Sequence, residues 1–517
     1  MDAQQFRECG RAVIDMLADY YDNIRNRKVL PSVEPGYLIK TAPENAPEQP
    51  EKWEHVLKEF CEIVMPGVTH WHSPQFHAYF PHGSSFGNII GSLLSEGIAV
   101  MGFTWIASPA CTELEVVTMN WLGKLLGLPE EFLNCSPGPG GGIIQGSASE
   151  AALVGLLAAK DKMVRKLLRR DPDIDTELIK TKFVAYASDQ CNSCVEKAGV
   201  LGSMKMRLLQ SDSNCKLRGE TLRKAFEEDK AKGLIPCYVI ANLGTTGTCA
   251  FDPLYELGPV CKEESVWLHV DAAYAGAACI CPEYRYIMEG IEYVDSFDVN
   301  VHKWLLVSFD CSAMWVRDSF DLINAFDVQR IYLDDVKSDA NVPGSEEIVP
   351  DYRHWQMPLG RRFRSLKLWT VLKIHGAEGL RSHIRNHITL AKHFVTLVRA
   401  DERFVVEPEP VMGLVCFRLK NDDSSTKQLL KNLTAKKEIF MVACMYRGRY
   451  VIRFVICSRL TTKEDVEVSW NIIAKETSLI SRPTQEKKAI KAASKEPLYY
   501  HKNIPMETVN NFYERSK

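Results

Sequence analysis

Between residues 87 and 317, short apolar runs alternate with stretches of helical periodicity, and this alternation limits the folds that the chain can adopt. The runs at residues 183–186, 238–241 and 266–270 are typical of buried strands, whereas residues 150–169 are rich in alanine and leucine and predict a helix. Strands separated by helices predict a mainly parallel sheet covered by helices on both faces. Ligands in such proteins bind beyond the carboxyl ends of the strands.

Two charged residues in unusual settings follow these elements. Asp271 comes directly after the run at residues 266–270 and is followed by small residues that would let a flat ring approach. Lys303 lies between His302 and Trp304 and precedes an apolar run, where burial would lower its pKa and make it a usable nucleophile. Taken singly, each is an ordinary turn aspartate or surface lysine. Together they are what a protein must supply to bind pyridoxal phosphate, namely an acid for the ring nitrogen and a lysine for a Schiff base.

A candidate phosphate site lies upstream. A glycine-rich run at residues 138–142 is followed by Ser147, Ala148 and Ser149, which lead into the predicted helix. Small residues before a helix expose backbone N–H groups and the positive end of the helix dipole to a phosphate. A flexible loop with a serine cap is the plainer interpretation, but Asp271 and Lys303 make the phosphate cradle the better one.

Length and patterning predict several domains. The chain has 517 residues, of which 46% are hydrophobic, enough for a large core and two or more domains. We expect an N-terminal helical arm with a pocket segment over residues 1–85, a large cofactor-binding domain over 86–360, a small α+β domain over 361–480 and a weakly patterned tail over 481–517. Residues 327–349 are polar without a strong period, which predicts a long loop of the kind that closes over active sites.

Composition argues against several partners. The net charge of −3 gives no indication of nucleic acid or of an anionic membrane as a partner. No secretory signal is recognisable at the N-terminus, and the sixteen scattered cysteines predict reduced thiols in a cytoplasmic protein. Residues 89–107 are apolar but interrupted by Ser95, Glu96 and glycines, so we expect buried core rather than a membrane span.

The motifs around Ser147–Ser149, Asp271–Tyr274 and Asn300–Trp304 together resemble the PLP-dependent group II amino acid decarboxylases, and most closely the aromatic-L-amino-acid (dopa) decarboxylases. The resemblance covers roughly residues 1–478. It implies an α/β protein of PLP fold-type I (aspartate aminotransferase-like) that forms an intertwined homodimer. It also implies a Schiff base at Lys303 and the ring nitrogen on Asp271. The other residues that it places at the cofactor are Ser147, Ala148, Ser149, Asn192, Thr246, Ala273, Asn300 and His302.

Residues 70–82 are dense in histidine and aromatic side chains. A metal site is conceivable there, but no Asp, Glu or Cys is interleaved, and we expect no metal. In the resembling family this segment lines the substrate pocket, which implies contacts from Trp71, Tyr79, Phe80, Pro81 and His82, with Met101 and Phe103 contributed by the other subunit. His82 departs from the threonine usual in dopa decarboxylases, so its contact is uncertain. Tyr332 matches the catalytic-loop tyrosine that protonates the substrate Cα, which yields the amine.

The clearest departure from the family pattern is Asn192, where dopa decarboxylases have a histidine stacked on the cofactor. Cys191 and Cys194 have the spacing of a zinc or redox motif, but no second ligand pair lies nearby, and we reject that interpretation. Imidazole titrates near neutral pH and can relay a proton, whereas an amide does not titrate. Without that group the Cα carbanion should live longer and react with dioxygen.

Asn192 in this position resembles the insect 3,4-dihydroxyphenylacetaldehyde synthases, whose aldehyde product crosslinks protein in flexible cuticle. The favoured hypothesis is therefore decarboxylation coupled to oxidative deamination of L-dopa, with O2 as second substrate and aldehyde, CO2, NH3 and H2O2 as products. The alternative is an aromatic-L-amino-acid decarboxylase that releases the amine. A glutamate or cysteine-sulfinate decarboxylase is disfavoured because the pocket segment is aromatic and contains no arginine. A non-catalytic relative is disfavoured because Lys303 and Asp271 are retained.

Overall fold

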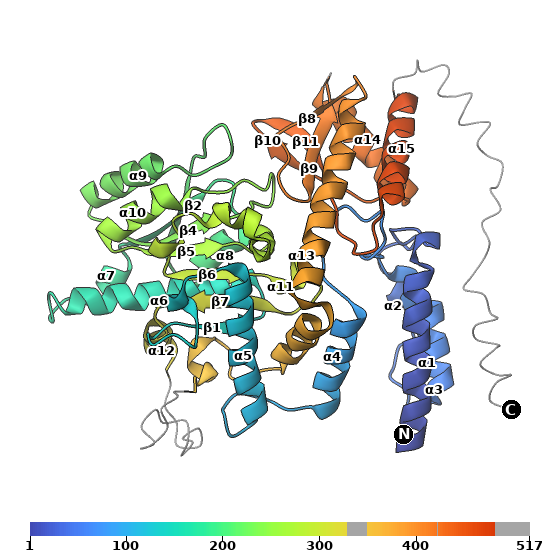
Figure 1. The fold of residues 1–517 in the computed structure, drawn as a ribbon, viewed down its shortest axis with the longest axis horizontal. Coiled ribbons are helices and arrows are strands. Elements are labelled where there is room, and N and C mark those ends of the chain that lie inside the picture. Colours follow the sequence, from blue (N-terminus) through green and yellow to red (C-terminus); the bar gives the residue numbers. More distant parts are fainter. Residues whose placement is uncertain (328–348, 421, 481–517) are drawn as a thin grey trace.

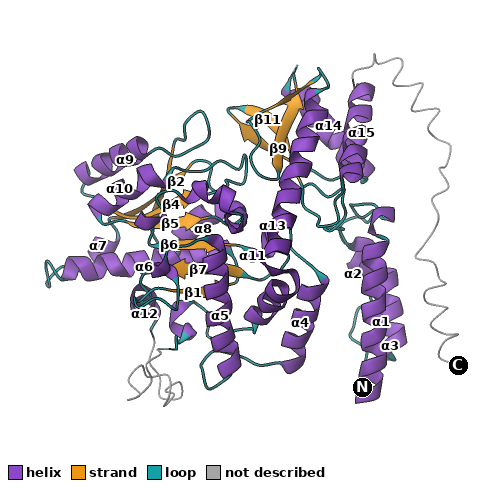
Figure 2. Cartoon of the chain, in the orientation of Figure 1, coloured by secondary structure: helices purple, strands orange, loops and turns teal. Residues whose placement is uncertain are grey.

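The computed structural model describes residues 1–327, 349–420 and 422–480, and these residues contain two β-sheets surrounded by helices (Figures 1 and 2). The larger sheet has seven strands in the order β1-β7-β6-β5-β4-β2-β3. The strands span Gly141–Gln145 (β1), Phe183–Ser188 (β2), Lys205–Leu209 (β3), Ile235–Asn242 (β4), Trp267–Asp271 (β5), Ser296–Val299 (β6) and Ser312–Val316 (β7). Strands β2 to β6 pair in parallel, and β7 runs antiparallel to its neighbours β1 and β6.

Both faces of the large sheet are buried. In β2, Phe183, Ala185 and Ala187 pack into one core, whereas Val184 and Tyr186 pack into another, because successive side chains of a strand point to opposite faces. The first core is covered by α6 (Ala148–Leu168), α8 (Ser193–Leu201) and α12 (Phe320–Phe326), and the second by α5 (Pro109–Leu126), α9 (Gly219–Ala231) and α10 (Leu254–Glu264). Apolar residues on both faces explain why the strands read as continuous apolar runs.

The second sheet is antiparallel, with strands in the order β10-β11-β9-β8. These strands span Phe404–Val406 (β8), Leu414–Leu419 (β9), Val442–Tyr446 (β10) and Arg449–Val455 (β11), and they pack with α14 (Asp423–Lys436) and α15 (Lys463–Ile480). The long helix α13 (Arg364–Arg399) joins the two parts, since its first half packs in the core of the large sheet and its second half in that of the small sheet. Gly376 has non-helical backbone dihedral angles, so α13 consists of two helical parts that meet at a kink.

The N-terminal helices are gathered at the opposite side of the molecule from α9 and α10 (Figure 1). They are α1 (Ala3–Asp22), α2 (Tyr37–Thr41) and α3 (Trp53–Glu59). A further short helix, α7 (Thr176–Lys180), follows α6. An ion pair of 2.9 Å between Arg25 and Asp465 ties this region to α15. In the part of the chain that the structure describes, no helix has both the length and the apolar content needed to cross a membrane.

The apolar stretch at residues 89–107 differs from its expected burial. It forms most of α4 (Phe86–Ile98) and the segment that follows, and several of its large apolar side chains are exposed. Leu93 is 50% exposed, Ile98 58% and Met101 61%. The prediction of buried core was wrong for the single chain, because only one face of α4 packs, against α13.

Candidate active site

A cavity of about 180 Å³ lies beyond the carboxyl ends of β4 and β5, where the sequence pattern places the ligand. Ten of the predicted site residues line it: Phe80, Ser147, Ala148, Ser149, Asn192, Thr246, Asp271, Ala273, Asn300 and Lys303. Five further lining residues were not predicted as site residues, namely Cys194, Asn242, Gly244, Thr245 and Tyr274. The structure thus brings together segments that are up to 223 residues apart in the sequence, from Phe80 to Lys303.

Lys303 reaches the cavity from the short helix α11 (Val301–Trp304). Burial lowers the pKa of its amine, although the negative charges of Asp271 and Asp298 oppose this effect. Its Nζ lies 5.4 Å from the ring centroid of Phe80. A lysine that is more easily deprotonated than usual is a better nucleophile toward an aldehyde.

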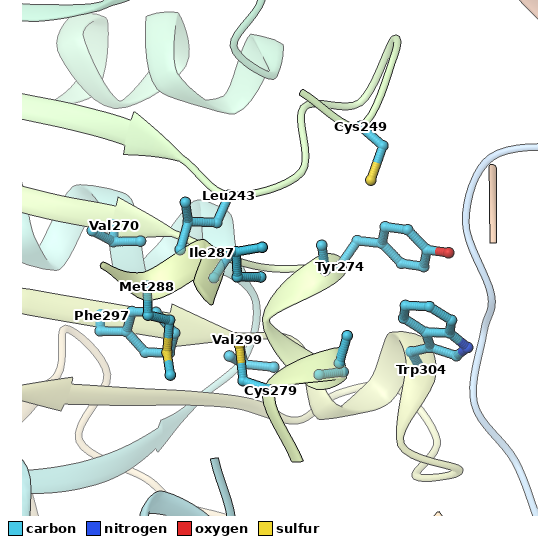
Figure 3. Close-up of a cluster of buried hydrophobic side chains, with 14 of the residues drawn as sticks. Leu243, Cys249, Val270, Tyr274, Cys279, Ile287, Met288, Phe297, Val299 and Trp304 are labelled. Carbon is cyan, nitrogen blue, oxygen red and sulfur yellow. The ribbon is translucent and has the colours of Figure 1, made fainter. Parts of the chain in front are cut away.

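Three stacked aromatic rings lie next to Asp271 and Lys303 in the sequence or in the cavity wall. Phe80 stacks on Tyr274 with 4.0 Å between ring centroids, and Tyr274 stacks on Trp304 with 4.6 Å. Figure 3 shows Tyr274 and Trp304 at the edge of the apolar cluster that includes Val270 and Phe297. The stack therefore holds the chain just after each reactive group, because Tyr274 lies three residues after Asp271 and Trp304 directly follows Lys303.

Asp271 is the last residue of β5, and its Oδ1 accepts a hydrogen bond from the backbone N–H of Ala273 at 3.0 Å. This bond fixes the carboxylate at the carboxyl end of β5. On the other side of the cavity, Ser147 caps the N-terminus of α6, and the backbone N–H of Ala148 donates to Oδ1 of Asn300 at 3.0 Å. A long helix that begins among serines provides the donors and the dipole that bind a phosphate.

These groups fit pyridoxal phosphate. The cofactor needs an anion site for its phosphate, an amine for its aldehyde and an acid for its ring nitrogen. The start of α6, Lys303 and Asp271 supply these three groups around one cavity.

Asn192 is held at both ends of its side chain. Its Oδ1 accepts from the backbone N–H of Cys194 at 3.0 Å and so caps α8, and its Nδ2 donates to Oγ1 of Thr246 at 3.0 Å. The capping role explains the local fold, because asparagine is among the best N-cap residues. Burial raises the pKa of the thiols of Cys191 and Cys194 to about 12, so neither is an activated thiolate.

Of the predicted substrate residues, Phe80 lines this cavity and the others do not. Trp71 stacks on Tyr79 with 5.3 Å between centroids, and both are partly exposed. His82 lies 6.0 Å from Trp71, also between ring centroids. Residues 71 and 72 form a turn and not a strand. Pro81 and Phe103 are not among the cavity residues either.

His302 is not among the cavity residues either. Its Nδ1 lies 2.8 Å from the carbonyl oxygen of Cys311, and burial together with the positive charge of Lys303 lowers its pKa to about 3. The imidazole is therefore neutral and held by backbone. Tyr332 and most of the loop expected at residues 327–349 lie outside the described residues.

Arg453 is a charged neighbour of the site that sequence reasoning missed. It comes from β11 and donates to the carbonyl oxygens of Gly247 at 3.2 Å and of Tyr79 at 3.0 Å. Its guanidinium carbon lies 5.1 Å from the ring centroid of Phe80. The strand-like run at residues 450–454 indicated β11 but gave no sign that this arginine faces the large sheet.

A family model for the pyridoxal-dependent decarboxylase conserved domain matches residues 35–420. The chain belongs to this family. Among curated relatives, a 3,4-dihydroxyphenylacetaldehyde synthase from Aedes aegypti is 51% identical over 480 residues, which cover 93% of this chain and 91% of the relative. An aromatic-L-amino-acid decarboxylase from Drosophila melanogaster is 53% identical over 474 residues, which cover 92% and 91%. The crystal structure of Oryza sativa TDC with PLP and tryptamine is 36% identical with a TM-score of 0.88, covering 93% of this chain and 99% of that one.

The family assignment confirms the predicted fold-type I architecture, the cofactor and the enzyme class. The protein is a pyridoxal-dependent decarboxylase, and pyridoxal phosphate is its cofactor. Relatives with two different product names have nearly the same identity to this chain, so overall similarity does not choose between aldehyde and amine.

Proposed function

We propose that this pyridoxal-dependent decarboxylase is a 3,4-dihydroxyphenylacetaldehyde synthase that acts on L-dopa. One amino acid, one O2 and one water would give one aromatic acetaldehyde, one CO2, one NH3 and one H2O2. The observation that carries the proposal is Asn192, which lines the cofactor cavity with an amide in place of a titrating group.

The role of Asn192 follows from its two hydrogen bonds. Bound pyridoxal phosphate supplies the electron sink that lets the bond between Cα and the carboxylate break. Cα must then gain a proton if an amine is to form. Asn192 cannot supply or relay that proton, because an amide does not titrate and its oxygen and one N–H are already engaged by Cys194 and Thr246. Dioxygen can then accept the two electrons from Cα, which gives an imine that hydrolyses to the aldehyde.

An aromatic substrate is supported by the segment that precedes Phe80 in the chain. Trp71, Phe76 and Tyr79 form a cluster of aromatic rings, with 4.6 Å between the centroids of Trp71 and Phe76. Flat apolar surfaces of this kind bind an aromatic side chain. The positive charge of Arg453 beside Phe80 is placed to attract the substrate carboxylate. We propose that Phe80, Pro81 and His82 complete this pocket.

We also propose a homodimer, because α4 exposes a row of apolar side chains. Four of them, Ile90, Leu93, Leu94 and Ile98, are 45–58% exposed. Leu93 and Leu94 lie three and four residues after Ile90, and Ile98 lies four after Leu94, so they share one face of the helix. A contiguous exposed apolar surface of this kind marks a protein interface. In that dimer, Met101 and Phe103 would reach the pocket of the second subunit.

We propose a cytoplasmic location as well, which the sixteen free cysteines support.

The second candidate function is that of an aromatic-L-amino-acid decarboxylase, the name of relatives that are up to 53% identical to this chain. In that case Tyr332 would donate the proton to Cα despite Asn192. The two candidates differ in oxygen use, which makes them separable in one assay.

The test is the amount of H2O2 formed per CO2 released from L-dopa in air by the purified holoenzyme. We expect a ratio near one for the natural chain and a large fall for Asn192→His, with the amine appearing instead. Asn192→Ser is the matched control, because serine retains the helix cap without adding a titrating group, and it should keep forming aldehyde. A ratio near zero for the natural chain, with dopamine as product, would refute the proposal in favour of the decarboxylase.

A further inference from the structure

A polar cluster lies behind Asp271 on one face of the large sheet. His269 and Asp271 on β5 face Ser296 and Asp298 on β6, since the two strands pair with His269 opposite Ser296 and Asp271 opposite Asp298. Residues two apart on a strand point to the same face, so all four side chains share it. The carboxylate of Asp298 is therefore the lateral neighbour of the one that faces the cofactor.

Asp298 has an electrostatic partner but few hydrogen bonds. Its Oδ1 lies 3.2 Å from Nε2 of His269, and both side chains are fully buried. Within residues 1–327, 349–420 and 422–480, neither carboxylate oxygen has a well-aligned hydrogen-bond donor. His269 is oriented by Ser296, whose Oγ lies 2.8 Å from its Nδ1. A buried carboxylate is costly unless a neighbouring group compensates it, and the geometry provides the His269 ring, 3.2 Å away, for that purpose.

Helix α6 seals this cluster from water. It crosses the sheet at Gly155, where an added Cβ would lie 2.9 Å from the Tyr238 hydroxyl and 3.6 Å from His269 Nδ1. Only a glycine allows the helix to pass this close. With water excluded, charges in the cluster act over longer distances than they would at the surface.

The field of Asp298 reaches the cofactor cavity. Its negative charge raises the pKa of Lys303 against the effect of burial, and burial raises the pKa of Asp298 itself to about 6. The titratable groups that face it come from four elements: His269 and Asp271 on β5, Tyr238 on β4, Cys194 on α8 and Lys303 on α11.

We propose that Asp298, compensated from behind by His269, is a positioning residue that reinforces Asp271 in holding the protonated ring nitrogen of pyridoxal phosphate. Asp298 lies level with Asp271 in the strand register, whereas His269 lies two residues farther back. The negative member of the pair is therefore the nearer one, and the pair adds negative potential at the carboxyl end of β5. This role concerns the cofactor alone and is independent of whether aldehyde or amine is the product.

The test is Asp298→Asn in the full-length protein, with two readouts besides activity. The first is the dissociation constant of pyridoxal phosphate. We expect it to rise roughly tenfold, the change in an equilibrium constant that corresponds to one pKa unit. The second is the pH titration of the visible absorbance of the bound cofactor. Its midpoint should move to lower pH, because a cation near less negative charge loses its proton more easily.

Asp295→Asn is the matched control. Asp295 precedes the same strand, accepts from the Leu268 N–H at 2.9 Å and lies 3.6 Å from Lys162. Its loss should lower the melting temperature without moving either cofactor readout. Equal cofactor shifts in Asp295→Asn and Asp298→Asn would overturn the proposal by showing a merely structural effect, and so would an unchanged cofactor affinity and titration in Asp298→Asn.

His269→Gln provides an independent variant should Asp298→Asn not fold. The His269 ring lowers the pKa of Asp298, so without it the buried carboxylate should take up a proton, which removes the same negative charge and weakens cofactor binding. The double variant should bind the cofactor no more weakly than either single one, because both changes remove one interaction. Additive losses, or His269→Gln with natural affinity, would refute the proposed pairing.

Discussion

Replacing Arg361 with methionine tests how the segment after residue 349 is attached to the large sheet. Arg361 donates to the carboxylate of Glu115 on α5, and each of the two side chains is 1% exposed. Glu115 also accepts from the backbone N–H of Ile144 on β1 at 2.7 Å. Methionine retains an apolar stem but removes the charge, so Glu115 would stay buried with one backbone donor.

The expected loss follows from this burial. Removing one partner of a buried ion pair costs about 3–5 kcal/mol, because the remaining charge is uncompensated. The unfolding entropy is roughly 2.1 cal/mol/K per residue, which for the whole chain is about 1.1 kcal/mol/K. The melting temperature of Arg361→Met should therefore fall by about 3–5 °C.

Thermal unfolding of the cofactor-loaded proteins, followed by circular dichroism at neutral pH, measures this fall. The double variant Arg361→Met/Glu115→Gln is the control, and it should recover a large part of the loss because it leaves no buried charge. A melting temperature of Arg361→Met equal to that of the natural protein would refute the reasoning. So would a double variant less stable than the single one.

Three other properties can be checked. Burial lowers the pKa of His77 from 6.5 to about 4, so the folded state binds fewer protons than the unfolded one between these values, and stability is lost as the pH falls through them, by about 3 kcal/mol; His77→Gln should flatten this dependence in denaturant titrations at several pH values. Gly155→Ala should lower the melting temperature because its Cβ would lie 2.9 Å from the Tyr238 hydroxyl, whereas Gly379→Ala, which meets only His375 Cβ at 3.5 Å, should not. Leu93→Lys on the exposed face of α4 should yield monomers in light scattering, and a persisting dimer would show that this face is not the interface.

The sequence predicted the elements whose residues are uniform in character. The runs at residues 183–186, 238–241 and 266–270 are β2, β4 and β5, and the alanine-rich stretch is α6. Strand β1 was missed because its glycines indicated a loop, although Gly142 is needed where an added Cβ would lie 2.7 Å from Trp315. The exposed face of α4 was read as core, because an apolar helix looks the same from the sequence whether it packs inside a chain or against another.

For the site, sequence reasoning identified cavity-lining residues where they lie close to the end of a strand or the start of a helix. Asp271, Thr246 and Ser147 follow directly from such positions. Arg453 was missed because its contacts with Gly247 and Tyr79 span more than 200 residues and leave no local pattern. The pairing of Asp298 with His269 was missed for a related reason, since the register between neighbouring strands is set by the sheet and not by either strand alone.

The contacts of Arg453 also determine when the site can first exist as the protein is made. Phe76 packs on Phe440 with 5.7 Å between ring centroids, and Arg453 holds the backbone of both Tyr79 and Gly247. Synthesis proceeds from the N-terminus, so the large sheet can form while these late residues are still missing. A nascent or truncated chain that ends before β11 therefore contains Lys303 and Asp271 but lacks Arg453, which holds the backbone at Gly247. We therefore expect the cofactor to bind only after β11 has been synthesised.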